Sequence, residues 1–159
     1  MGSQHDPVFW EGRFALGIQI IDRQHEKLVK MVKNLLSIKQ ERHENDNASF
    51  LKNINETANF LQYHFITEEK LMLLLDYREY LSHKEMHGSL LEEAQKLTFA
   101  EAGMDHEDLA GLIRLLLESG LHHLETNDRA FADYYFELRE SGCLRKTFII
   151  DSARTPILA

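Results

Sequence analysis

Proline is nearly absent from this 159-residue sequence, which has only Pro7 and Pro156. Because proline removes a backbone N–H and clashes with the preceding turn of a helix, the stretch between these two residues permits long helices. Cysteine is equally scarce, since Cys143 stands alone. An intramolecular disulfide and a cysteine-based zinc site are therefore excluded. Nothing in the sequence requires an oxidising compartment.

Positive charge is also in short supply. The chain has 18 Lys and Arg against 26 Asp and Glu, a formal net charge of −8, and no basic patch. Nucleic acids and anionic membrane surfaces select such patches, so neither is expected as a partner. No stretch approaches the ~18 uninterrupted apolar residues of a membrane span, and the N-terminus does not resemble a secretory signal. We expect a cytoplasmic location.

The sequence does contain four blocks of apolar residues at helical spacing. Polar breaks separate the blocks at residues 42–47, 76–78 and 102–105. Short connections favour antiparallel neighbours. We therefore predict an all-α protein, an up-down-up-down antiparallel four-helix bundle formed by residues 19–140. The first helix is predicted to begin at Asp22, whose carboxylate can cap free N–H groups two or three residues further on.

An N-terminal arm, residues 1–18, and a short C-terminal extension, residues 141–159, lie outside the predicted bundle. The arm carries Phe9, Trp10 and Phe14, and such aromatic side chains are expected to pack on the outside or the end of the bundle. The extension includes a segment of β-like composition, residues 147–150, but one short strand without a partner is marginal. We assign the extension no role.

Seven polar residues interrupt the apolar stripes of the four predicted helices. They are His25 in the first, His64 and Glu68 in the second, His83 and His87 in the third, and His123 and Asp128 in the fourth. Each unpaired polar group buried in this way costs about 1 to 3 kcal/mol. One inward histidine is more often a core residue bonded to a carbonyl, but seven such residues together indicate a shared metal partner.

The spacing of these residues supports a common site. Residues four apart stack on one face of a helix, so His64 projects with Glu68, and His83 with His87. His123 and Asp128 are five apart, which separates them by roughly 140° around an ideal helix. Either Asp128 reaches sideways, or the fourth helix has a local π-type widening, which often marks a functional site.

The ligand set favours iron. Zinc prefers four ligands, calcium and magnesium prefer oxygen, and mixed imidazole and carboxylate ligands suit iron, with manganese a weaker option. Seven protein ligands divide over two octahedral ions if both carboxylates bridge and a solvent-derived oxo or hydroxo group is added. Three histidines then complete one iron, and two leave the other five-coordinate. A small diatomic or peroxide could bind at the open position.

These residues resemble the hemerythrin family, in particular its bacterial members. The matching segments, within residues 9–138, are Trp10, Gly17-Ile18, residues 21–25, residues 64–69, His83 to His87, and His123 to Asp128. The resemblance implies that His83, His87 and His123 hold one iron, that His25 and His64 hold the other, and that Glu68 and Asp128 bridge them. It also implies reversible binding of dioxygen at the iron held by His25 and His64, for transport, storage or sensing.

One departure concerns the residues before His123. The family often has a bulky Trp-Leu pair where this chain has Ser119 and Gly120. We expect these two residues to line a ligand pocket with Leu116 and Leu124. The smaller pair either opens that pocket or is compensated by larger neighbours such as Leu116 and Leu121. An open pocket favours the alternative function, a diiron enzyme acting on peroxide, nitric oxide or another substrate with dioxygen; a sensor acting through the arm or the extension is a third hypothesis.

Overall fold

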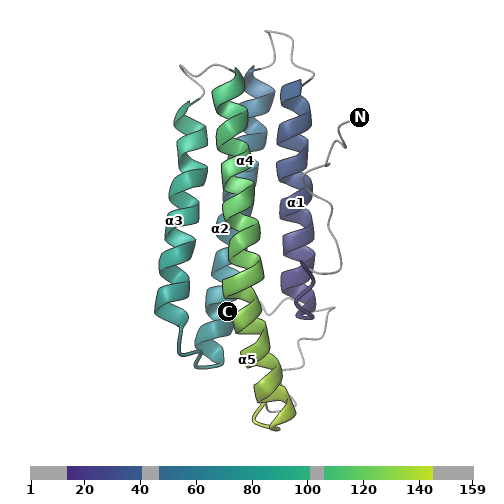
Figure 1. Ribbon diagram of the computed structural model, residues 1–159, viewed down its shortest axis with the longest axis vertical. Coiled ribbons are helices and arrows are strands. Elements are labelled where there is room, and N and C mark those ends of the chain that lie inside the picture. The colour runs from purple at the N-terminus through teal and green to yellow at the C-terminus, as the bar shows by residue number, and fades with distance from the viewer. Residues whose placement is uncertain (1–13, 41–46, 101–105, 145–159) are drawn as a thin grey trace, which may run out of the picture.

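The computed structural model describes residues 14–40, 47–100 and 106–144. Its helices are α1 (Gln19–Gln40), α2 (Asn47–Leu74), α3 (Tyr80–Ala100), α4 (His106–His123), a π-helical segment η2 (Leu124–Asp128) and α5 (Arg129–Glu140). α1, α2, α3 and α4 lie side by side along one axis, and α5 continues α4 past the end of the other helices (Figure 1). The predicted four-helix bundle is confirmed, and no described residue is in a strand.

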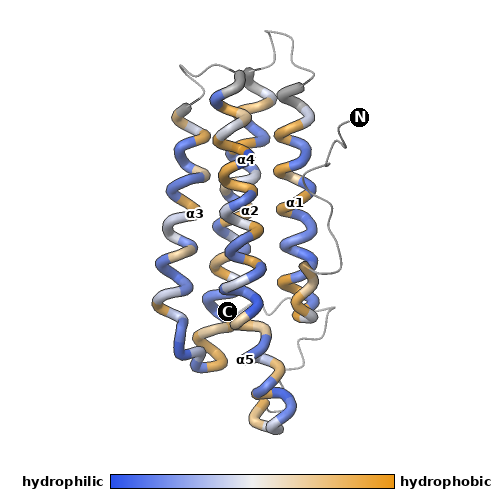
Figure 2. The backbone as a smooth tube through the Cα atoms, viewed as in Figure 1, coloured by the Kyte–Doolittle hydropathy of each residue, from blue (hydrophilic) through white to orange (hydrophobic). Residues whose placement is uncertain are grey.

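Each helix combines an inward apolar stripe with polar residues facing outward, as amphipathic helices in a bundle require. Figure 2 shows the resulting alternation of hydrophobic and hydrophilic residues along the helices. Within the described part of the chain, no helix is both long enough and apolar enough to cross a membrane.

α1 begins at Gln19, three residues earlier than the prediction of a start at Asp22. The Asp22 carboxylate does not cap the following turn; it accepts hydrogen bonds from the preceding backbone, from Leu16 N at 2.7 Å and Gly17 N at 2.9 Å. Gly17 has φ +88°, and a Cβ there would lie 2.9 Å from the Phe136 ring. Asp22 thus fixes the arm against the first turn instead of starting the helix.

The turn between α2 and α3 sets how these two helices face each other. Tyr77 N donates to Met72 O at 2.9 Å and Asp76 N to Leu73 O at 3.3 Å, and Asp76 has φ +54°. This is a Schellman C-cap with aspartate at the left-handed position that glycine usually occupies. From α5, the Tyr134 hydroxyl donates to Leu75 O at 2.8 Å. The turn is therefore held by its own backbone and by α5.

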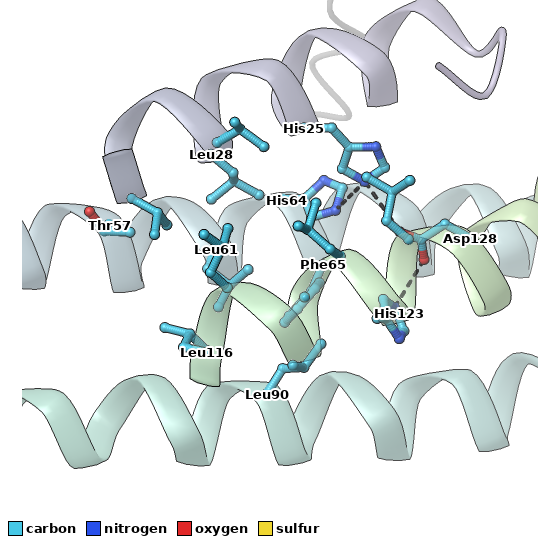
Figure 3. Close-up of a pocket in the computed structure, with 16 residues that line it drawn as sticks. His25, Leu28, Thr57, Leu61, His64, Phe65, Leu90, Leu116, His123 and Asp128 are labelled. Carbon is cyan, nitrogen blue, oxygen red and sulfur yellow. Dashed lines mark hydrogen bonds and ion pairs between the residues drawn. The ribbon is translucent and has the colours of Figure 1, made fainter. Parts of the chain in front are cut away.

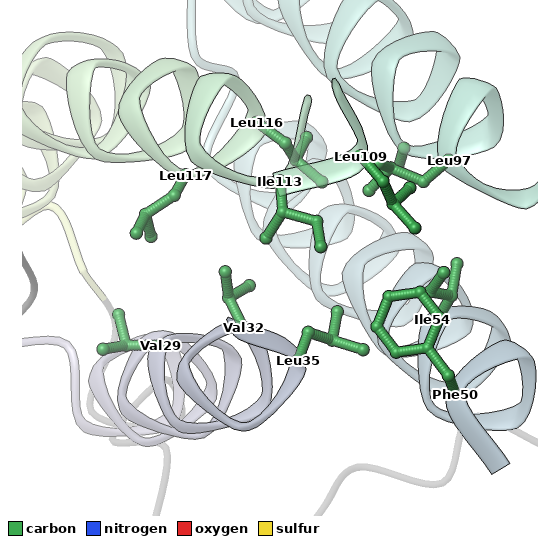
Figure 4. Packing of buried hydrophobic residues seen from close by; sticks show 11 residues of the cluster. Val29, Val32, Leu35, Phe50, Ile54, Leu97, Leu109, Ile113, Leu116 and Leu117 are labelled. Carbon is green, nitrogen blue, oxygen red and sulfur yellow. The ribbon is translucent and has the colours of Figure 1, made fainter. Parts of the chain in front are cut away.

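Two apolar clusters fill the interior at different levels. The first, shown in Figure 4, contains Val29, Val32, Leu35, Phe50, Ile54, Ala94, Leu97, Leu109, Ile113, Leu116 and Leu117. The second contains Phe14, Leu16, Ile18, Ile21, Met72, Leu75, Leu124, Phe131 and Ala132. Fully burying an aliphatic or aromatic side chain of this size contributes about 1.5 to 3 kcal/mol. In α1 and α2, the polar residues His25, His64 and Glu68 lie in the sequence between members of the two clusters.

The arm and the extension are described only in part. Phe14 is 2% exposed and packs in the second cluster, at the end of the bundle to which α5 belongs. Arg129 Nη1 donates to the Ala15 carbonyl at 3.0 Å, which ties the arm to α5. Phe9, Trp10 and residues 147–150 lie outside the described residues.

Candidate metal centre

The seven predicted ligand residues come together from all four long helices, and all of them are buried. α1 supplies His25, α2 His64 and Glu68, α3 His83 and His87, and α4 with η2 supplies His123 and Asp128. They form two overlapping groups, which we call the three-histidine group (Glu68, His83, His87, His123, Asp128) and the two-histidine group (His25, His64, Glu68, Asp128). Both carboxylates belong to both groups.

The π-helical segment brings Asp128 into line with His123. The Arg129 N–H bonds back to the Leu124 carbonyl, five residues earlier. This widened turn places residues i and i+5 on one face, where an α-helix would separate them. As a result, Asp128 Oδ1 lies 2.9 Å from His123 Nε2. Of the two geometries that the sequence left open, the π-type widening is the one observed.

Asp128 lies between the two groups. Its Oδ1 faces the three-histidine group, at 2.9 Å from His123 Nε2 and 3.1 Å from His83 Nε2. Its Oδ2 faces the two-histidine group, at 3.3 Å from His25 Nε2. One carboxylate thus directs a different oxygen to each group, as a bridging ligand does.

Glu68 takes a similar position with longer separations. Its Oε2 lies 3.3 Å from His87 Nε2 and 3.7 Å from the Nε2 atoms of His83 and His64. Its Oε1 lies 3.9 Å from His25 Nε2. Within the two-histidine group, the Nε2 atoms of His25 and His64 approach to 3.1 Å. The donor atoms of both groups therefore converge on one small volume.

The donor atoms at the centre lack the hydrogen bonds that buried polar groups normally make. Among the described residues, no hydrogen bond satisfies either carboxylate oxygen of Glu68, Oδ1 of Asp128, or Nε2 of His83, His87 and His123. Orphaned groups of this kind cost about 1 to 3 kcal/mol each when nothing binds them. Imidazole nitrogens and carboxylate oxygens together suit a transition metal such as iron. The residues present therefore fit a metal.

Comparison with known proteins agrees with this geometry. The family model described as the hemerythrin HHE cation binding domain matches residues 16–141, which include all seven predicted ligand residues. The chain belongs to the hemerythrin family. The hemerythrin domain implies that the centre binds iron.

Bacterial hemerythrins are among the similar proteins. The bacteriohemerythrin of Pseudomonas aeruginosa is 28% identical over 128 residues, covering 79% of this chain and 80% of the relative. That of Stenotrophomonas maltophilia is 30% identical over 129 residues, with the same two coverages. That of Clostridium acetobutylicum is 24% identical over 126 residues, covering 78% of this chain and 98% of the relative.

The charges in the hemerythrin centre suit metal binding. Burial and Asp128 would raise the pKa of Glu68, but the surrounding imidazoles lower it to about 2. Burial would likewise raise the pKa of Asp128, but contact with His123, His25 and His83 holds it well below its usual range. Both carboxyl groups are therefore anionic at neutral pH and free to act as ligands.

Two histidines of the centre have pKa values shifted in opposite directions. Burial lowers the pKa of His64 to about 4, so this imidazole is neutral and ready to bind a metal. Burial would lower the pKa of His83 as well, but its contacts with Asp128 and Glu68 outweigh that effect and raise it to about 9. A metal ion that binds His83 would displace a proton from it.

Each group has one histidine whose outer ring nitrogen is held by a neighbouring side chain. In the two-histidine group, His64 Nδ1 lies 3.0 Å from Gln24 Oε1, and Gln24 Nε2 donates to Thr67 Oγ1 at 3.3 Å. In the three-histidine group, His87 Nδ1 lies 3.1 Å from Glu69 Oε1. A carbonyl or carboxylate at Nδ1 fixes the tautomer that leaves Nε2 to the metal.

The contacts of Gln24 and Glu69 with the histidines could not be read from the sequence. Gln24 directly precedes the predicted ligand His25 and is 6% exposed, an unusual burial for glutamine. Glu69 pairs with Lys84 Nζ at 3.2 Å through one oxygen and contacts His87 through the other. Each of these residues contacts a histidine on a neighbouring helix. A spacing rule within one helix does not reveal such a contact.

An apolar cavity of about 80 Å³ adjoins the hemerythrin centre. It contacts both histidines of the two-histidine group, together with His123 and Asp128, but not His83, His87 or Glu68. Of the four predicted pocket residues, Leu116, Gly120 and Leu124 line the cavity, whereas Ser119 is half-buried and does not. Figure 3 shows the cavity beside His25 and His64. His122, next to the ligand His123, is exposed.

Proposed function

We propose that the seven residues hold two iron ions, joined by Glu68, Asp128 and an oxo or hydroxo bridge, and that the protein binds dioxygen reversibly. The bound iron pair would supply the electrons for reversible dioxygen binding. The contact of the cavity with the two-histidine group carries the proposal, because this is the group with one imidazole fewer. A small ligand that enters the cavity meets His25 and His64 before it meets His83 or His87.

The protein contributes by holding the metal-binding histidines in place and by excluding water from the centre. Gln24 orients His64, and Glu69 orients His87, so the imidazoles need not reorganise when a ligand arrives. Phe65 stacks on His87 with ring centroids 3.8 Å apart and planes within 10°, which covers the three-histidine group. Aliphatic side chains line the approach to the other group and offer water few hydrogen bonds.

Iron loading without oxygen tests the proposal. We expect two irons per chain and a coloured species that forms under oxygen and disappears under argon over repeated cycles of the optical spectrum. The alternative, a diiron enzyme acting on peroxide, nitric oxide or another substrate with dioxygen, predicts rapid conversion to a fixed ferric form with turnover of added peroxide. Failure to bind two irons would overturn both.

The cavity at Gly120 is the observation that favours the enzyme alternative. A Cβ added at Gly120 would meet nothing within 4 Å, so this position leaves space beside the centre. In a doubly substituted chain, Ser119→Trp with Gly120→Leu, the leucine occupies that space and the tryptophan adds bulk at the neighbouring half-buried position. If access controls decay of the oxygen adduct, the double variant autoxidises more slowly than the native chain; equal rates would remove this support for the alternative.

A further inference from the structure

The cavity beside the metal centre is longer than a diatomic ligand needs. Its lining spans several turns of three helices: His25 to Val32 on α1, Thr57 to Phe65 on α2, and Leu116 to Asp128 on α4 and η2. At 1.5 Å per residue, even the shortest of these intervals is about 10 Å long. In Figure 3, Leu28, Thr57, Leu61 and Leu116 lie on one side of His64, and Asp128 lies on the other. The cavity therefore runs along the bundle, away from the centre.

The volume of the cavity also exceeds that of a diatomic. It measures about 80 Å³, whereas one water needs about 10–15 Å³ on a comparable scale. A dry protein cavity of about 150 Å³ holds benzene, with six carbon atoms. By proportion, this cavity holds a molecule of about three carbon atoms, and its length requires that molecule to be slender.

The chemistry of the lining selects an apolar occupant. Beyond the ligand residues it is formed by Leu28, Val29, Val32, Leu61, Phe65, Leu90, Leu116, Leu117, Gly120, Leu121, Leu124 and Thr57. Thr57 is the one polar side chain in that set, and its hydroxyl already donates to the Asn53 carbonyl at 2.8 Å. No charged side chain of the described lining lies away from the metal centre, so an anionic or strongly polar molecule gains no partner there.

The cavity comes near the surface at residues of three helices. Most of its lining residues are buried, but Leu28 on α1, Leu61 on α2, and Gly120 and Leu121 on α4 are half-buried. A Cβ at Gly120 would meet no atom within 4 Å. A molecule can therefore reach the cavity past Gly120 without displacing a side chain at that position.

We propose that the cavity is a second ligand site, which takes a slender aliphatic molecule of about three carbon atoms in addition to the small ligand of the metal centre. The molecule enters at Gly120 and lies along the bundle, with one end toward His25 and His64 and the other toward Thr57. This second-site proposal depends on the proposed function in one respect only, which is the identity of the metal centre at the inner end of the cavity.

Xenon and propane are suitable probes because both are apolar and fit the cavity. We would measure their binding to the full-length chain by the chemical shift of ¹²⁹Xe and by propane competition, with and without iron and always without oxygen. We expect saturable xenon binding that propane displaces in both forms. The absence of saturable binding, or xenon binding that propane does not displace, would overturn the proposal. Neither result depends on reversible dioxygen binding, so the two proposals fail separately.

Gly120→Leu locates the site. Leucine at this position should fill the opening and weaken propane binding by at least tenfold. Gly111→Leu is the matched control, because Gly111 lies on the same helix, outside the cavity lining, and a Cβ there also meets nothing within 4 Å. Native affinity in Gly120→Leu, or an equal loss in Gly111→Leu, would contradict the assigned opening. If Gly120→Leu folds poorly by circular dichroism, Gly120→Ala gives the same comparison with a smaller loss.

Thr57→Val tests the class of ligand. Valine has the shape of threonine without the hydroxyl, so propane should bind as tightly as before or more tightly. Comparison with 1-propanol completes the test: if the native chain bound 1-propanol at least tenfold more tightly than propane and Thr57→Val lost that preference, the far end of the cavity would recognise a polar group and the aliphatic assignment would be overturned.

Discussion

The two histidine groups share two carboxylates, but they differ in the side chains that contact their outer ring nitrogens and in their contact with the apolar cavity. In the two-histidine group, the outer nitrogen of His64 contacts the neutral amide of Gln24. In the three-histidine group, the outer nitrogen of His87 contacts the Glu69 carboxylate, which also pairs with Lys84. An anionic partner makes an imidazole a stronger donor than a neutral one does. The two groups therefore offer a bound metal different electronic environments.

The groups also differ in access. The apolar cavity reaches both members of the histidine pair and only His123 of the other three histidines. Protonation does not divide the groups in the same way. Burial lowers the pKa of His64 to about 4, but contacts with the carboxylates outweigh burial and raise the pKa of His25 and of His83, the latter to about 9. The difference that separates the two groups is therefore their contact with the apolar cavity.

Replacing one predicted metal-binding histidine, in either group, should have the largest effect of the changes that we predict, a loss of bound iron. We expect His64→Ala to retain at most one iron per chain, because the two-histidine group would keep a single imidazole. His87→Ala should also fall below two, since the three-histidine group loses the ligand that Glu69 orients. Iron per chain after anaerobic loading is the measurement, with His122→Ala, an exposed neighbour of His123, as the control. Two irons retained in either ligand variant would refute the ligand assignment.

The raised pKa of His83 predicts how stability depends on pH without metal. The folded pKa of His83, about 9, lies above its usual value of 6.5. Its stabilising contribution is therefore complete below pH 6.5 and disappears as pH rises through about 9, a loss of about 3 kcal/mol. Urea unfolding of the metal-free chain at pH 6 and pH 9.5 measures the loss. His83→Gln should remove the part of this dependence that comes from His83 and leave the part that comes from His25, whose pKa is also raised; an unchanged profile in that variant would argue against the prediction.

Substitution of Glu69 or Gln24, the side chains that contact the outer histidine nitrogens, tests whether the two groups differ electronically. Glu69→Ala should weaken iron binding by about 10- to 100-fold, the usual effect of losing such a partner. Glu69→Gln keeps the hydrogen bond but removes the charge, so it should raise the reduction potential with a smaller loss of affinity. Gln24→Glu adds a charge on the other side and should lower the potential. The exposed Glu85→Gln is the control; equal shifts in Glu85→Gln and Glu69→Gln would indicate a general effect of charge.

The smallest predicted effect is a change in stability. It tests whether the space at Gly120, beside the two-histidine group, is open. Gly120→Ala should stabilise the chain by about 0.5–1 kcal/mol, because alanine favours a helix over glycine by that amount and its Cβ meets nothing within 4 Å. Gly111→Ala on the same helix should give the same gain. Thermal unfolding of the metal-free variants compares the two, and a destabilised Gly120→Ala would mean that the space beside the two-histidine group is filled.

Much of the bundle could be predicted because its signals are local. Scarce proline, the apolar spacing and the polar breaks located the helices to within a few residues, and the five-residue interval from His123 to Asp128 already suggested a π-type turn. The predicted start at Asp22 was wrong because its carboxylate bonds to the backbone before it. The preference of aspartate for the start of a helix does not indicate whether its carboxylate bonds to the backbone before it or after it.

The sequence by itself determined the four helices and the seven polar residues on their inward faces, because helical periodicity fixes which side chains share a face. Only the tertiary structure decided that Asp128 directs one oxygen to each group, that Gln24 and Glu69 hold different histidines, and that the cavity adjoins only part of the centre. These features depend on contacts between helices, and their geometry follows from how the helices pack together.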